Sequence, residues 1–276
     1  MAYWQWGSIQ AEHVVLCVHG LTRQGRDFDV LAQALLEDAQ GDVCVICPDV
    51  VGRGHSDWLG HAAGYQIPTY VADMLTLVRQ LQPRTLDWVG TSMGGLIGMA
   101  ASAPLAELGF PIRRLVLNDV GPAMEWPALQ RIANYVGQNM QFASLEQGLR
   151  GLQFLFTGFG ALSDAQWRAL SLPMLKKMPD SNAYSLHYDP AIGLPFQALT
   201  KDLAQQAESI WWQVYDALPC HTLLLRGAES DLLSALTAQQ MTQRGPSGRL
   251  IEFAGVGHAP SLVVAEQVDA IVSFLR

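Results

Sequence analysis

Short apolar runs alternate with longer amphipathic stretches along most of the chain. The runs are rich in Val, Leu and Ile, which is typical of strands buried on both faces. They span residues 14–18, 43–47, 86–89, 115–117, 222–225 and 250–253. Between them, apolar residues recur at helical spacing, as in 71–81 and 264–275. This alternation predicts an α/β fold with a doubly wound, mostly parallel sheet.

One segment interrupts the alternation. It follows Asn118-Asp119-Val120-Gly121-Pro122 and is too long for a simple crossover between strands. Three helical patterns are followed by a loop rich in Pro and Gly. The helices are expected near 127–138, 145–156 and 164–177, and the loop over 179–195. We therefore expect an α/β core made of residues 1–122 and 208–276, with residues 123–207 inserted as a helical cap.

Composition narrows the range of functions. The 276 residues are 50% hydrophobic, enough for a large core, so a disordered protein is excluded. Seventeen basic and 25 acidic residues give a net charge of -8, which disfavours nucleic acid as a partner. No export signal and no membrane-length apolar run is apparent. We expect a cytoplasmic protein that acts on a small molecule without stable membrane insertion; its oligomeric state is left open.

Neither a metal nor a cofactor is expected. Cys44 and Cys47 form a C-x-x-C, but residues three apart on a strand point to opposite faces, so their sulfurs cannot share one metal. The glycines between Pro48 and Ser56 follow a strand, yet they lack the lysine of a P-loop and the spacing of a dinucleotide fingerprint. This segment is expected to be a structural turn, and the cysteines buried thiols of a reducing compartment.

A candidate nucleophile lies in Gly90-Thr91-Ser92-Met93-Gly94. The pentapeptide follows the strand 86–89 and precedes a helical run, which is the context of a nucleophile elbow. Such a strand-to-helix turn holds its serine strained at the apex, and small residues two positions away avoid collisions. We expect Ser92 to be the nucleophile.

A serine nucleophile needs a base, and the base needs an orienting acid. His258 follows the last strand, in the position that the chain order nucleophile, acid, histidine requires. Asp231, after the strand 222–225, is the preferred acid. Glu229 is the second choice, and Asp119, after the strand 115–117, is the third.

Main-chain amides can stabilise the oxyanion of acyl transfer. The amide of Met93 follows the nucleophile directly. The loop His19-Gly20-Leu21 follows the strand 14–18, and its glycine allows a close approach. Leu21 and Met93 are therefore the expected oxyanion-hole donors.

Taken together, these motifs resemble the capped α/β-hydrolase superfamily. The resemblance rests on His19-Gly20, the turn from Pro48 to Ser56, the elbow around Ser92, Ser230-Asp231 and Gly257-His258, and it extends over nearly the whole chain. It implies hydrolysis of carboxylic esters. Serine as nucleophile departs from the haloalkane dehalogenase and epoxide hydrolase branches, which use a carboxylate.

The sequence thus predicts a serine esterase for small to medium, largely apolar substrates, acting through an acyl-enzyme with Ser92, His258 and Asp231. The resemblance leaves open a lactonase, a hydrolase of hydroxyalkanoate oligomers or polyesters, or a carbon-carbon bond hydrolase. A small-ligand binding protein on the same fold is the non-enzymatic alternative; a complete triad disfavours it.

Overall fold

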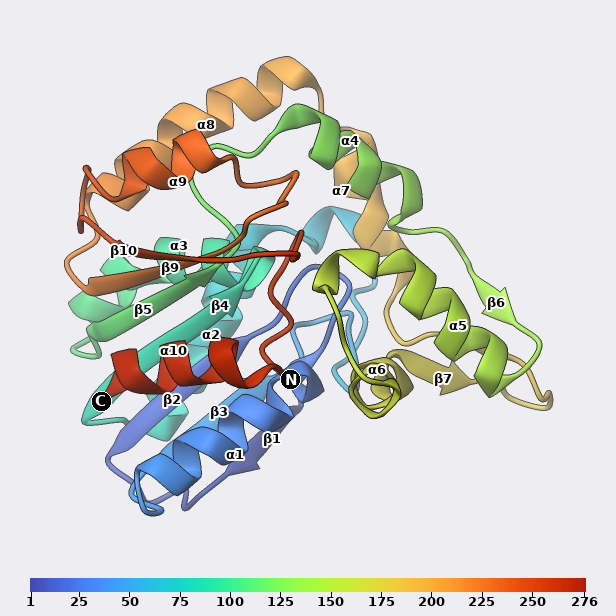
Figure 1. The fold of residues 1–276 in the computed structure, drawn as a ribbon, viewed down its shortest axis with the longest axis horizontal. Helices are drawn as coiled ribbons and strands as arrows, with labels where there is room; N and C mark the ends of the chain where they lie inside the picture. The colour runs from blue at the N-terminus through green and yellow to red at the C-terminus, as the bar shows by residue number, and fades with distance from the viewer.

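The computed structural model describes all 276 residues and is built around a seven-stranded sheet (Figure 1). The strand order is β1-β3-β2-β4-β5-β9-β10, and every neighbouring pair is parallel except β1 with β3. The strands are β1 (Tyr3–Trp6), β2 (His13–Val18), β3 (Cys44–Pro48), β4 (Thr85–Thr91), β5 (Ile112–Asn118), β9 (His221–Gly227) and β10 (Arg249–Phe253). The sheet confirms the predicted doubly wound α/β fold. The edge strand β1 was not predicted.

Helices cover both faces of this sheet. In Figure 1, α1 and α10 lie in front of it and α2 and α3 lie behind it. The helices between or after core strands are α1 (Asp29–Asp38), α2 (Ile67–Leu81), α3 (Met93–Glu107), α9 (Ala235–Met241) and α10 (Ala265–Leu275), with two short 3-10 helices at Gly25–Phe28 and Ala62–Gly64. The amphipathic patterns at 71–81 and 264–275 therefore mark real helices.

The sheet separates two hydrophobic clusters, one on each face. Alternate residues of one strand join different clusters. Cys44 belongs to the cluster beneath α2 and α3, whereas Cys47 belongs to the one beneath α1 and α10. The two thiols therefore lie on opposite faces, as their spacing predicted, and all four cysteines are buried and free.

In Figure 1, the segment between β5 and β9 runs along the top and the right-hand side of the sheet. Its three short strands make an antiparallel sheet in the order β6-β8-β7. Its main elements are α4 (Trp126–Tyr135), β6 (Gln141–Phe142), α5 (Leu145–Leu155), α6 (Asp164–Ser171), β7 (Leu175–Lys177), β8 (Tyr184–Leu186), α7 (Leu194–Gln197) and α8 (Lys201–Asp216). Short 3-10 helices lie at Thr157–Phe159, Leu172–Met174 and Pro190–Gly193.

Three details of this inserted segment differ from the expectation. The helix predicted to reach residue 177 ends at Ser171, because Pro173 has no N–H to continue the helical ladder, and the chain becomes β7 instead. The loop predicted over 179–195 contains β8. The expected boundary between residues 207 and 208 falls inside α8, whose buried Trp212 and Tyr215 pack against the core.

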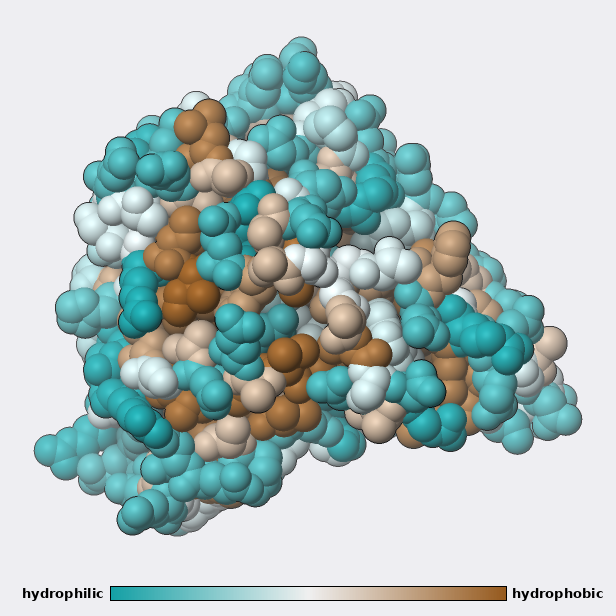
Figure 2. All heavy atoms as spheres, in the orientation of Figure 1, coloured by the Kyte–Doolittle hydropathy of each residue, from teal (hydrophilic) through white to brown (hydrophobic).

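No helix is both long enough and apolar enough to cross a membrane. Figure 2 shows hydrophilic side chains around most of the rim of one face and apolar side chains gathered nearer its middle.

Candidate active site

The elbow around Ser92 is held by close backbone packing. Ser92 joins β4 to α3 with φ 51° and ψ −116°, in the left-handed half of backbone space that side chains rarely occupy. A Cβ on Gly90 would lie 2.4 Å from the carbonyl carbon of Gly94, and one on Gly94 would lie 1.9 Å from the oxygen of Val18. These contacts explain why the elbow requires glycine on both sides of the serine.

Ser92, His258 and Asp119 form one chain of hydrogen bonds. His258 Nε2 lies 3.0 Å from Ser92 Oγ, and His258 Nδ1 lies 2.7 Å from Asp119 Oδ2. Asp119 is fully buried and also accepts hydrogen bonds from the Gly227 amide at 2.9 Å and the Ser230 hydroxyl at 2.6 Å. An accepting carboxylate places the imidazole proton on Nδ1, which leaves Nε2 free to accept the serine proton.

Asp231, the acid preferred from the sequence, does not face His258. Its carboxylate is about half exposed and receives two hydrogen bonds from Arg131, at 2.8 and 2.9 Å. The turn after β9 directs Ser230 inward to Asp119 and Asp231 outward to α4. Glu229 is exposed as well. Asp119, the third choice, therefore takes the position expected of Asp231.

The two expected oxyanion donors lie beside the serine. Leu21, Met93 and Ser92 line one cavity, and neither the Leu21 nor the Met93 main-chain N–H donates a hydrogen bond within the chain. His19 braces the Leu21 amide: its Nε2 accepts from the Val50 amide at 2.9 Å, so its Nδ1–H donates to the Gly20 oxygen at 2.7 Å. That oxygen and the Leu21 N–H belong to one peptide group. Burial lowers the pKa of His19 to about 3, which keeps the ring neutral.

Arg53 is a buried cation behind the same donors, and no sequence motif pointed to its role. Its side chain is fully buried and bonds no carboxylate. Nε donates to the Leu21 oxygen at 2.8 Å, Nη1 to the Val51 oxygen and the Tyr70 hydroxyl, and Nη2 lies 3.6 Å from Met93 Sδ. Burial lowers the pKa of this guanidinium. The turn from Pro48 to Ser56 thus helps to position the site.

Ser92 opens into two unlike cavities. The larger, of about 490 Å³, is mainly apolar and lies between α2 and the inserted segment; Glu208 is the one charged residue in its wall. The smaller cavity, of about 80 Å³, is lined by His258 and by three charged residues, Arg23, Asp27 and Arg131. The two sides of a substrate bound at Ser92 would therefore meet different surroundings.

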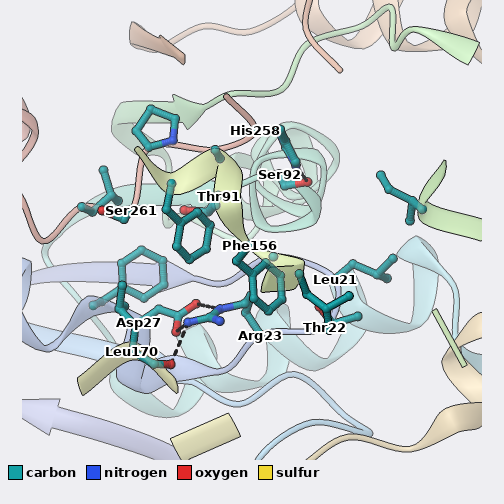
Figure 3. Close-up of a pocket in the computed structure, with 18 of the residues that line it drawn as sticks. Leu21, Thr22, Arg23, Asp27, Thr91, Ser92, Phe156, Leu170, His258 and Ser261 are labelled. Carbon is teal, nitrogen blue, oxygen red and sulfur yellow. Dashed lines mark hydrogen bonds and ion pairs between the residues drawn. The ribbon is translucent and has the colours of Figure 1, made fainter. Parts of the chain in front are cut away.

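Arg23 joins the core to the inserted segment in the smaller cavity (Figure 3). Its guanidinium donates to both oxygens of Asp27 at 2.7 and 2.6 Å and to the Leu170 oxygen at 3.0 Å. The rings of Phe156 and Phe159 lie 4.9 and 5.3 Å from its central carbon. Burial raises the pKa of Asp27, while the charge and hydrogen bonds of Arg23 oppose that rise.

Residues 15–273 match the sequence model of the alpha/beta hydrolase family. The chain belongs to the α/β hydrolase family. This hydrolase is 44% identical to a 3-hydroxybutyrate-oligomer hydrolase of Cupriavidus necator, over 99% of the present chain and 92% of that relative.

Solved structures agree on the fold of this α/β hydrolase. An α/β hydrolase from Novosphingobium aromaticivorans is 32% identical with a TM-score of 0.82, covering 99% of this chain and 92% of that one. A putative hydrolase from Rickettsia typhi is 28% identical with a TM-score of 0.86, covering 99% and 89%. The family and the fold implied by the sequence motifs are therefore confirmed.

In this hydrolase, no group of three or more His, Cys, Asp or Glu side chains is placed to hold a metal ion.

Proposed function

We propose that this hydrolase cleaves carboxylic esters by way of an acyl-enzyme, with Ser92, His258 and Asp119 as its triad. The continuous hydrogen bonding from Ser92 through His258 to Asp119, at 3.0 and 2.7 Å, carries the proposal. The 44% identical relative supports esters of hydroxy acid oligomers as the substrate class.

The mechanism follows from this geometry. Ser92 Oγ bonds to the ester carbonyl carbon as its proton passes to His258 Nε2, and the oxyanion is met by the Leu21 and Met93 amides. The carbon–oxygen bond to the leaving alcohol breaks as His258 returns the proton to that oxygen. Water, deprotonated by His258, then releases the acid and restores Ser92. Asp119 fixes the histidine tautomer and stabilises the imidazolium.

The first test is hydrolysis of nitrophenyl esters of increasing chain length and of a 3-hydroxybutyrate dimer. Ser92→Ala should lower kcat by about 10⁴-fold or more while leaving the circular dichroism spectrum unchanged. A folded wild type without activity on any ester would contradict the proposal and favour a carbon-carbon bond hydrolase or a binding protein. Activity confined to cyclic esters would favour a lactonase.

The choice of acid has its own test. Asp119→Asn should reduce kcat by about 10³-fold or more, because an amide in this place favours the wrong histidine tautomer. Asp231→Asn is the matched control, and its activity on a neutral nitrophenyl ester should stay within a few-fold of wild type. A large loss for Asp231→Asn with little loss for Asp119→Asn would reverse the assignment.

A further inference from the structure

We propose that Arg131 binds the free carboxylate of the substrate, so that the enzyme removes hydroxy acid units from the carboxyl end of an oligomer. This inference rests on the proposed ester hydrolysis and adds a binding site and an end preference to it. A hydroxy acid oligomer carries a hydroxyl at one end and a carboxylate at the other. The carboxylate belongs to the unit that leaves as the alcohol when the last ester bond is cleaved.

The position of His258 decides which cavity receives the leaving alcohol. His258 must protonate the leaving oxygen, and it lines the smaller cavity but not the larger one. The alcohol side of the ester therefore enters the smaller cavity and the acyl side enters the larger. Volumes of about 80 and 490 Å³ suit one short unit on the alcohol side and a longer apolar chain on the acyl side.

The charges of the two cavities agree with this orientation. A carboxylate in the larger cavity would meet no cation in the cavity wall, where Glu208 is the one charged residue and would repel it. The smaller cavity offers Arg23 and Arg131, in a protein whose net charge is -8. Guanidinium groups pair with carboxylates through two parallel hydrogen bonds.

Of the two arginines, Arg131 is the one free to change partner. Arg23 is 7% exposed and is already held by both oxygens of Asp27, by Leu170 and by two aromatic rings. The ion pair of Arg131 with Asp231 is exposed on both sides, at 47% and 49%, and such pairs are weak in water. A substrate carboxylate can therefore displace Asp231 from the guanidinium of Arg131.

The test compares a 3-hydroxybutyrate dimer with the same dimer ending in a carboxamide, which keeps the scissile ester and removes the charge. Wild type should prefer the acid. Arg131→Gln should lower the ratio of kcat/KM for acid over amide by about 3- to 10-fold, chiefly through KM of the acid, because a charge-assisted but partly exposed pair is lost. Arg150→Gln, at an exposed arginine of α5, is the matched control and should leave the ratio unchanged.

Asp231→Asn provides the opposite perturbation. Removing the competing carboxylate should lower KM for the acid several-fold, and the gain should shrink as salt is raised. A trimer labelled in its carboxyl-terminal unit should release labelled monomer first. The proposal is overturned if Arg131→Gln leaves the ratio unchanged, or if the trimer loses its hydroxyl-terminal unit first. If the wild-type enzyme hydrolysed no nitrophenyl ester, that result would instead refute the proposed ester hydrolysis on which this inference rests.

Discussion

At the scale of single residues, His19 shows how a buried ring can brace a main-chain donor. The ring is completely buried between the Val50 amide and the Gly20 oxygen and is neutral in the folded protein. Its pKa falls from 6.5 to about 3 on folding, mainly because burial penalises the charged form.

This shift predicts a pH dependence of stability. Between pH 6.5 and about 3 the unfolded chain binds a proton on His19 that the folded chain does not, so the free energy of unfolding decreases as the pH falls. Above pH 6.5 the ring is neutral in both states and the effect vanishes. At about 1.4 kcal/mol per pKa unit, the loss reaches on the order of 4 to 5 kcal/mol.

His19→Gln removes the titrating group and should flatten this part of the curve of stability against pH. The measurement is the free energy of unfolding in urea at intervals from pH 3.5 to 7.5. His61→Gln, at an exposed histidine, controls for the substitution itself. An equal dependence on pH in wild type and His19→Gln would show that His19 is not kept neutral by the fold.

At the scale of elements, the elbow depends on how closely α3 approaches the end of β2. Both the carbonyl carbon and the oxygen of Val18 lie within 2.5 Å of where a Gly94 Cβ would be. The Trp88 indole N–H, from β4, also donates to the Gly94 oxygen at 3.0 Å and so holds the first turn of α3 against the sheet. The contact between Gly94 of α3 and Val18 of β2 thus positions both Ser92 and the loop that contains Leu21.

Gly94→Ala should therefore impair both stability and catalysis. The main chain of β2 or α3 must move to admit the methyl group, which should cost about 1 to 3 kcal/mol or more of unfolding free energy. The same movement should separate the Leu21 and Met93 amides and lower kcat/KM at least 10-fold. Urea unfolding and nitrophenyl ester kinetics measure the two effects.

Gly60→Ala is the control for this substitution, since a Cβ there meets nothing within 4 Å. If the two variants behaved alike, close packing at Gly94 would not be what holds the elbow.

At the scale of the whole molecule, Arg23 ties the inserted segment to the core beside the nucleophile. It comes from the loop after β2, yet its contacts with Leu170, Phe156 and Phe159 are all in the insertion. Removing the guanidinium would leave the carboxylate of Asp27 without its partner in a largely buried place. The insertion should then open from the core more often.

Arg23→Met should therefore raise the amide hydrogen exchange of residues 156–171 by at least 10-fold, with little change in β4 and β5. Exchange measured by mass spectrometry on peptides would show this difference. Arg168→Met, at an exposed arginine of α6, is the control. Equal exchange in wild type and Arg23→Met would mean that other contacts hold the insertion.

Local patterns along the chain were sufficient for the fold and for placing two members of the proposed triad. Continuous apolar runs mark buried parallel strands, and the elbow and the last strand place Ser92 and His258 within a few residues of recognisable structure. Such signals are short-range, since each depends on the main chain and its immediate neighbours.

The acid of the proposed triad was chosen from the tertiary structure. β5 and β9 are neighbours in the sheet, so an acidic residue that follows either strand can lie near His258. No local sequence pattern distinguishes the two positions. In the structure, the turn after β9 directs Ser230 toward Asp119, whereas Asp231 points away from His258 to Arg131 of α4. The contacts of Arg53 and Arg131 also could not be predicted from local patterns, because most of their partners lie on other elements of the fold. Motifs depend on local backbone geometry, whereas the partner of a charged side chain is decided by packing among elements far apart in the chain.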